Sequence, residues 1–212
     1  MPTHLPSTEM LVDYASGAAS PGSSLLIAAH LEQAPESCRQ VSELERIGGA
    51  VLSGEAPEAM SAGALAGIFD KIDQGVAGAE PAPIRGAGPL PQPVIDAVGL
   101  PFDAIPWRFR LPGVSEYVLQ EYEPEKVSLL RAKPGASVPQ HTHTGPEMTL
   151  VMTGALQDGE TVFRAGDIAI NDEDDDHRPQ IIGDEVCYCL IVMEGSLHFT
   201  GRFSRALNFL TD

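Results

Sequence analysis

The sequence is short of basic side chains, of cysteine and of long apolar runs. It holds 13 lysines and arginines against 30 aspartates and glutamates, which gives a formal net charge of −17 over 212 residues. Such a surface repels nucleic-acid phosphates, so we expect no direct nucleic-acid partner. Three cysteines cannot form a disulfide framework, and they suit a reducing compartment. Because no segment approaches the roughly 18 apolar residues of a membrane span, and because the first ten residues lack the basic and apolar regions of a secretory signal, we expect a cytoplasmic protein with no membrane partner.

Turn-forming residues are plentiful instead, and they divide the chain. There are 21 glycines and 18 prolines. Residues 75–93 read GVAGAEPAPIRGAGPLPQP, a stretch without hydrophobic periodicity that breaks helix and strand alike. This pattern predicts a helical domain over residues 1–75, a Pro/Gly-rich linker over 76–94 and a second domain over 95–212.

Apolar residues before the linker recur at helical spacing. Ser7 and Ser20 are favourable N-caps for the first two helices, and proline follows Ser20 at the first helical position. The same spacing predicts a third helix over about 37–51 and a fourth after Ser61. Four short helices in fewer than 80 residues make a small four-helix bundle with a thin core, which a metal ion or a partner protein would stabilise.

After the linker the pattern changes to short alternating runs. About 100 residues are divided into several such runs by Pro and Gly turns. Many short strands with turn signals between them indicate a β-sandwich or jelly roll. The predicted fold class is therefore α + β, with a helical domain followed by an all-β domain.

One segment of the β domain carries metal-binding chemistry. His141 and His143 are two residues apart, so on a strand their side chains point to the same face. Glu147 follows a Thr-Gly-Pro turn that can return its carboxylate to that face, and His177 follows Gly166 by 11 residues and could complete the set from a neighbouring strand. Three imidazoles and one carboxylate suit zinc, iron, nickel, manganese or copper, and the ligand types alone do not choose among these metals.

The spacing of these residues resembles that of the cupins. From Gly135 to Gly154 the chain reads G-x5-H-x-H-x3-E-x6-G, which matches the first cupin motif at every fixed position. Gly166 and His177 keep a spacing of the second motif, although its usual Pro, Gly and Asn are replaced, here by Asp172, Asp174 and Ile181. The resemblance implies a double-stranded β-helix barrel, or jelly roll. Within it one divalent metal would be bound by four ligands: His141, His143, Glu147 and His177. Zinc is the first expectation, with iron, nickel or manganese as alternatives.

A helical bundle joined to a cupin resembles the ChrR-type anti-sigma factors over nearly the whole chain. The resemblance is carried by Tyr14-Ala15-Ser16-Gly17 at the end of the first helix, and by His30 followed by Cys38-Arg39. It implies that the helical domain sequesters an extracytoplasmic-function sigma factor. It also implies that the cupin domain is needed for the response to a chemical or oxidative signal.

The zinc signature of that family's helical domain is damaged here. The family has an upstream His with H-x3-C-x2-C; His4 and His30 match it, whereas Ala34 and Ser37 stand at the cysteine positions and Cys38 comes one place late. The resemblance therefore implies at most a degenerate zinc site of His4, His30 and Cys38. Losing thiolates removes much of the binding energy of such a site, so a second zinc is doubtful and a metal-free bundle is favoured.

Other interpretations remain open at this point. Metal-dependent cupin enzymes of the dioxygenase or isomerase type also use three histidines and a glutamate, and the helical part would then be an appendage. A cupin that binds a small ligand without turnover is a third hypothesis. Cys187 and Cys189 share one face of a strand, where they are either core thiols or an oxidation-sensitive pair. The acidic run 172–176 is either a solvated loop or an aid to His177.

Overall fold

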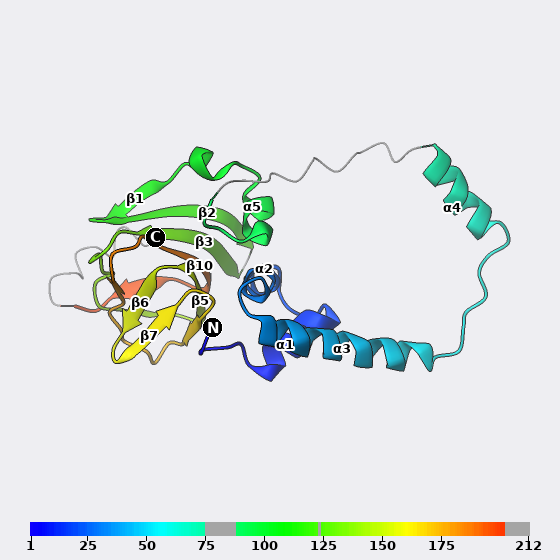
Figure 1. Ribbon diagram of the computed structural model, residues 1–212, viewed down its shortest axis with the longest axis horizontal. Helices are drawn as coiled ribbons and strands as arrows, with labels where there is room; N and C mark the ends of the chain where they lie inside the picture. The colour runs from blue at the N-terminus through cyan, green and yellow to red at the C-terminus, as the bar shows by residue number, and fades with distance from the viewer. Residues whose placement is uncertain (75–87, 123, 202–212) are drawn as a thin grey trace.

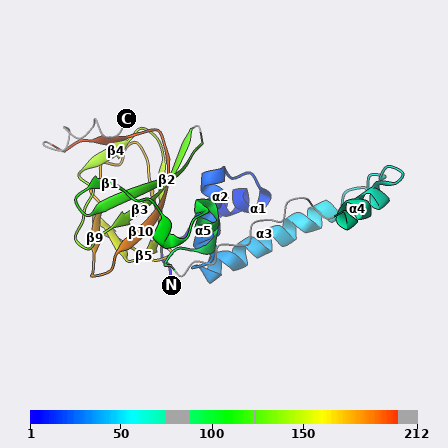
Figure 2. The same ribbon diagram turned by 90° about the horizontal axis from the view of Figure 1, so that it is seen from above.

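Helices lie on one side of a β-barrel in the computed structural model, which describes residues 1–74, 88–122 and 124–201 (Figure 1). Most of the predicted linker, residues 76–87, lies outside the described residues. Viewed from above, the first two helices rest beside the barrel while the third extends away from it and the fourth lies beyond its end (Figure 2).

The first helices begin where the sequence predicts. Ser7 Oγ accepts the N–H of Met10 and Ser20 Oγ accepts the N–H of Ser23, each at 3.2 Å, so both N-cap predictions are confirmed. The third helix starts slightly earlier than expected, with Pro35 in its first turn. The bounds are α1 Thr8–Ser16, α2 Pro21–Leu31, α3 Pro35–Ser53 and α4 Ala64–Asp73.

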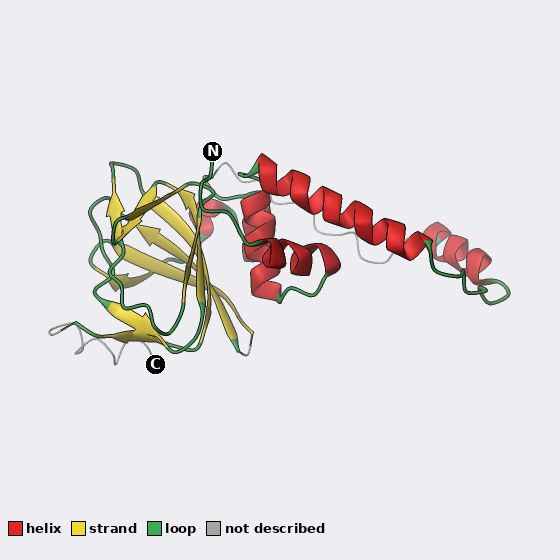
Figure 3. Ribbon diagram, turned by 90° about the horizontal axis from the view of Figure 1, so that it is seen from below, coloured by secondary structure: helices red, strands yellow, loops and turns green. Residues whose placement is uncertain are grey.

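The fourth helix does not pack with the other three. The buried residues of α1, α2 and α3 include Leu11, Leu26 and Val41, whereas α4 has none. Its apolar side chains are exposed: Leu65, Ile68, Phe69 and Ile72. The structure thus shows three packed helices and a separate fourth in place of the compact four-helix bundle expected from the spacing (Figure 3).

The β domain is an antiparallel, cupin-like barrel. A six-stranded sheet has the order β1-β2-β3-β10-β5-β8, a three-stranded sheet has the order β7-β6-β9, and β11 pairs with β4. Its strands are β1 Arg108–Leu111, β2 Val114–Tyr122, β3 Glu125–Ala132, β4 His141–His143, β5 Glu147–Thr153, β6 Ala155–Asp158, β7 Thr161–Arg164, β8 Ile168–Asn171, β9 Gln180–Ile182, β10 Cys187–Glu194 and β11 Leu197–Phe199. A short helix, α5 Gln92–Val98, and a 3-10 turn, Phe102–Ala104, precede β1.

The helices and the outer face of the six-stranded sheet share one apolar core. Along β10, Tyr188 and Leu190 face the helices, whereas Cys187 and Cys189 belong to a separate cluster on the other face. The shared core draws on α1, α2, α3, α5 and the sheet, with Leu11, Leu26, Ile27, Ala29, Val41, Val94, Ile95, Val98, Leu129, Leu150 and Leu190 among its members. Burial of this surface fixes the helices to the barrel.

Candidate metal centre

Strand β4 positions the first two candidate ligands. His141 and His143 are its first and last residues, and both are buried. Because alternate residues of a strand point to the same face, both rings lie on one face of β4, with their centroids 5.0 Å apart. An antiparallel bridge holds the third histidine beside them, because the N–H groups of His141 and His177 donate to each other's carbonyl oxygens at 3.0 and 2.9 Å.

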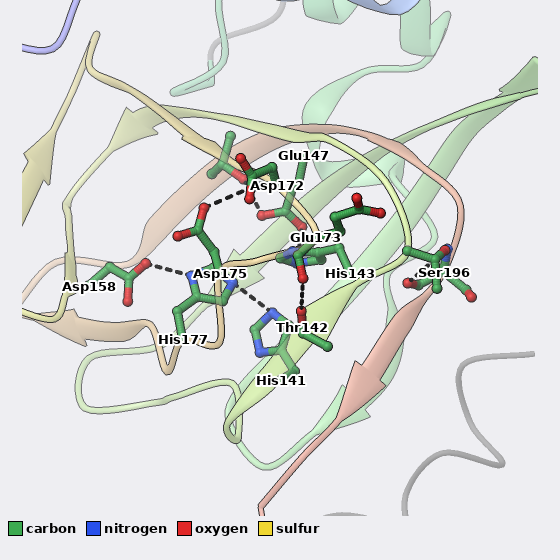
Figure 4. A network of polar contacts seen from close by, with 12 residues as sticks. His141, Thr142, His143, Glu147, Asp158, Asp172, Glu173, Asp175, His177 and Ser196 are labelled. Atoms are coloured by element: carbon green, nitrogen blue, oxygen red, sulfur yellow. Dashed lines mark hydrogen bonds and ion pairs between the residues drawn. The ribbon is translucent and has the colours of Figure 1, made fainter.

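The three imidazoles converge on one point. His177 Nε2 lies 3.1 Å from His141 Nε2, and one nitrogen from each of the three rings falls within 4.8 Å of the others (Figure 4). Across the part of the chain that the structure describes, no other three His, Cys, Asp or Glu side chains lie close enough to share an ion. The cluster could therefore hold a metal.

Two of the rings are oriented through their other nitrogen. His141 Nδ1–H donates to the Pro139 carbonyl at 2.8 Å, and His177 Nδ1–H donates to Asp158 Oδ2 at 2.5 Å. Each of these contacts leaves Nε2 free of the proton and aimed at the cluster (Figure 4). Partners of this kind fix the tautomer of metal-binding histidines and raise their basicity.

His143 and Glu147 complete the arrangement. Neither ring nitrogen of the buried His143 has a hydrogen-bond partner, and its Nε2 lies 3.2 Å from Glu147 Oε2. Glu147 is buried at the start of β5, where the Thr149 hydroxyl donates to its Oε1 at 3.2 Å. A buried imidazole without partners is costly unless something else satisfies it, and a bound cation would do so.

The pKa shifts of His141 and Glu147 favour the deprotonated forms that bind a metal, whereas the shift of His177 favours its protonated form. Burial and the neighbouring charge of His177 lower the pKa of His141 to about 4. Burial alone would raise the pKa of Glu147, but the close contact with the His143 ring and the charge of that ring bring it below its ordinary value. Burial likewise opposes a charged His177, yet its hydrogen bond to Asp158 raises the pKa of that ring. Metals bind the deprotonated forms, so protons compete with the ion as the pH falls.

A cavity of about 460 Å³ opens from this cluster into the barrel. His141, Glu147 and His177 line one part of it, and a charged group formed by Arg110, Glu116 and Lys126 lines another. Within that group Glu116 accepts from Arg110 Nε at 2.5 Å and lies 3.1 Å from Lys126 Nζ. The remaining wall is largely apolar: Leu111, Val114, Val118, Leu130, Val138, Leu156, Ile191, Met193, Leu197 and Phe199. Its size and mixed lining are typical of small-molecule sites.

The cysteine pair and the acidic run lie beside the cluster. Cys187 and Cys189 are buried with their sulfurs 3.6 Å apart, and Cys189 lines the cavity. The hydrogen bond with Cys187, together with burial, raises the pKa of the Cys189 thiol. The residues of the acidic run 172–176 are exposed, and the N–H of Asp172 donates to Asp175 Oδ2 at 2.9 Å.

The structure does not bring His4, His30 and Cys38 together. His30 is fully buried with both ring nitrogens bonded, Nδ1 to Gly166 O at 2.7 Å and Nε2 to Ser37 Oγ at 2.8 Å. Because α3 starts at Pro35, its first turn directs Ser37 and not Cys38 toward His30.

The other two candidates have separate surroundings. Cys38 is exposed and its Sγ lies 3.4 Å from the Leu31 carbonyl. The His4 ring stacks on Phe163 with centroids 4.6 Å apart, and its Nδ1 lies 3.6 Å from Asp167 Oδ2. Sequence spacing gave no signal for Asp158 as the partner of His177, or for the Gly166 carbonyl as the partner of His30, because each contact joins residues far apart in the chain.

Comparisons with known proteins agree with this layout. A family model described as the ChrR cupin-like domain matches residues 96–197. The anti-sigma-E factor ChrR of Cereibacter sphaeroides is 35% identical over 197 residues, 92% of each chain. The crystal structure of Rhodobacter sphaeroides SigE in complex with the anti-sigma ChrR superposes with a TM-score of 0.80 at 31% identity, covering 92% of this chain and all of that one. Within the described residues, no helix is long and apolar enough to cross a membrane.

Proposed function

Since the chain belongs to the ChrR family of anti-sigma factors, we propose that its residues 1–75 sequester an extracytoplasmic-function sigma factor in the cytoplasm. We further propose that the cupin domain, residues 95–212, is needed for release of that sigma factor in response to a chemical or oxidative signal. The observation that carries the proposal is the extent of the similarity, which covers the helices as well as the barrel.

The capture surface that we propose is an exposed apolar face on the helices farthest from the barrel. It consists of the following side chains, called the distal face below: Ile47, Val51 and Leu52 of α3, with Leu65, Ile68, Phe69 and Ile72 of α4. Exposed apolar side chains that gather on one helix face are typical of interaction sites. The fourth helix then completes a four-helix unit only together with the sigma factor.

The charge of the helical segment suits such a partner. Residues 1–74 contain ten aspartates and glutamates against three lysines and arginines. Sigma factors need basic surfaces to bind promoter DNA, and opposite charge speeds the encounter of two proteins. The chain would therefore act on transcription without touching the promoter.

We propose that the cupin domain binds one divalent metal through His141, His143, Glu147 and His177. The converging nitrogens and the unpartnered His143 support this ligand set, and zinc is the first candidate, with iron, nickel or manganese as alternatives. A bound ion would join β4, β5 and the loop before β9 into one unit. A small molecule that enters the adjoining cavity would reach these ligands directly.

The alternative of a metal-dependent cupin enzyme loses its main support. The family to which the chain belongs is one of anti-sigma factors, and the likeness covers the helical segment that an enzyme would carry only as an appendage. A cavity that binds a ligand without turnover fits the proposed sensing role.

Transcription from a purified system tests the proposal. The full chain is titrated into RNA polymerase carrying an extracytoplasmic-function sigma factor of the same organism, with the housekeeping sigma factor as control. We expect inhibition near one chain per sigma factor, and no effect on the control promoter. Undiminished transcription at a tenfold excess of the chain would contradict the proposal.

A further inference from the structure

We infer that the helical segment of this chain does without zinc, and that a hydrogen-bonded joint of Ser37, His30 and Gly166 stands in the metal's place and fastens the helices to the barrel. We call these three residues the His30 joint. The inference goes beyond the proposed function, because sigma capture requires neither the absence of zinc nor this connection.

Both nitrogens of His30 are already used. A carbonyl oxygen can only accept a hydrogen bond, so Nδ1 carries the proton and donates it to Gly166 O at 2.7 Å. Nε2 then accepts the hydroxyl proton of Ser37 at 2.8 Å. The ring is fully buried, and burial lowers its pKa, which keeps it in this neutral form. No ring nitrogen is left to bind an ion.

The remaining donors do not fit zinc either. Structural zinc sites are built from thiolates and imidazoles. The two positions that hold cysteine in the family signature carry the methyl group of Ala34, which is buried, and the hydroxyl of Ser37. Cys38 is exposed with its sulfur near the Leu31 carbonyl, so its thiol does not replace either of them.

The joint connects the helices to the barrel at a site where other polar contacts also converge. Asp167, next to Gly166 and buried, accepts the backbone N–H groups of Thr3 at 2.5 Å and His4 at 2.9 Å. The N–H of Ile168 in turn donates to the carbonyl of His4 at 2.9 Å. The N-terminal segment is thus tied to the same turn of the barrel as α2.

Gly166 is suited to this role by its backbone. Its φ of +89° lies in the region that favours glycine, and an added Cβ would come within 2.4 Å of Pro2 Cγ. The turn leads directly into β8, whose last residue, Asn171, pairs with Glu147. The joint therefore lies in the turn before the strand that pairs with Glu147, a proposed ligand of the cupin metal.

Metal content tests the zinc-free half of the inference. We would measure metal by plasma mass spectrometry in the full chain and in the His141→Ala/His143→Ala variant, which removes two cupin ligands. We expect one equivalent of metal in the full chain and none in the double variant. Adding Ala34→Cys and Ser37→Cys to the double variant should restore one equivalent of zinc. The inference is overturned if the variant retains one equivalent that is lost after Cys38→Ser. Sigma binding is not measured here, so this failure would leave the proposed function intact.

Hydrogen exchange tests the joint itself. In Ser37→Ala, and in His30→Asn as a second variant, the amides of His4 and Ile168 should exchange about fivefold faster, because loss of one buried hydrogen bond makes local opening easier by about 1 kcal/mol. Cys38→Ala, one residue along the same helix, is the matched control and should leave both amides unchanged. Exchange rates at wild-type values in both joint variants would overturn the inference.

Discussion

Replacing Phe69 by alanine should weaken sigma-factor binding while leaving the fold intact. Phe69 lies on α4 with 57% of its surface exposed, and Leu65 and Ile72, about one helical turn before and after it, are exposed as well. A phenylalanine that becomes fully buried removes about 150–250 Å² of its surface from water. A partner that covers the exposed 57% of Phe69 would therefore bury about 100 Å² of it. At about 25 cal/mol per Å², this area corresponds to about 2–3 kcal/mol of binding free energy. The predicted loss is therefore about 30- to 150-fold in Kd.

Calorimetric titration of the full chain with the sigma factor measures this loss, and urea unfolding measures stability. The free energy of unfolding should change by less than about 0.5 kcal/mol, because the ring has no buried contact to lose. Phe109→Ala is the matched control, since Phe109 is 74% exposed on β1 of the barrel and should not affect binding. If Phe69→Ala bound as tightly as the wild type, the distal face would not be the capture surface.

Three further predictions concern the barrel and its junction with the helices. Asp158→Asn removes the carboxylate that orients His177, a proposed metal ligand, and should weaken metal binding by the cupin domain about 10- to 100-fold in a chelator competition assay. An unchanged affinity would argue against His177 as a ligand. Gly22→Ala should lower the free energy of unfolding in urea by about 1–3 kcal/mol, because the added Cβ would lie 2.8 Å from Val192 Cγ1. Gly48→Ala is the control, since Gly48 has open space around it, and this change should be neutral or stabilising. The same change in stability for both variants would refute close packing at Gly22. Burial, opposed in part by Asp167, keeps the pKa of His30 below 6.5, so the unfolded chain binds the proton more readily. The stability advantage over His30→Asn should therefore be full above pH 6.5 and shrink below it, and an advantage that grew on acidification would contradict this.

Features that depend on local sequence were predictable. The caps at Ser7 and Ser20 need only a side-chain oxygen three residues ahead of an N–H, and both are present. The cupin-like β domain followed from turn residues and motif spacing. The position of α4 was not predictable, because helical periodicity reveals an apolar face but not what covers it. The predicted boundary between linker and second domain, at residues 94 and 95, falls inside α5. Val94 and Val98 of this helix both pack into the shared core.

The same distinction applies to the candidate site. His141, His143 and Glu147 lie within seven residues, so strand alternation and one turn suffice to bring them together. Asp158 orients His177 from 19 residues away, and no local pattern marks it. The partner of His30 is 136 residues distant in the chain, and for that reason a damaged zinc motif could not be recognised as a hydrogen-bonded joint.

Gel filtration with light scattering is the direct test of whether this chain binds a sigma factor. The full chain is mixed with an extracytoplasmic-function sigma factor of the same organism, in the absence of DNA and polymerase. We expect a single peak with the mass of a one-to-one complex. Two separate peaks at micromolar concentrations of both proteins would contradict it.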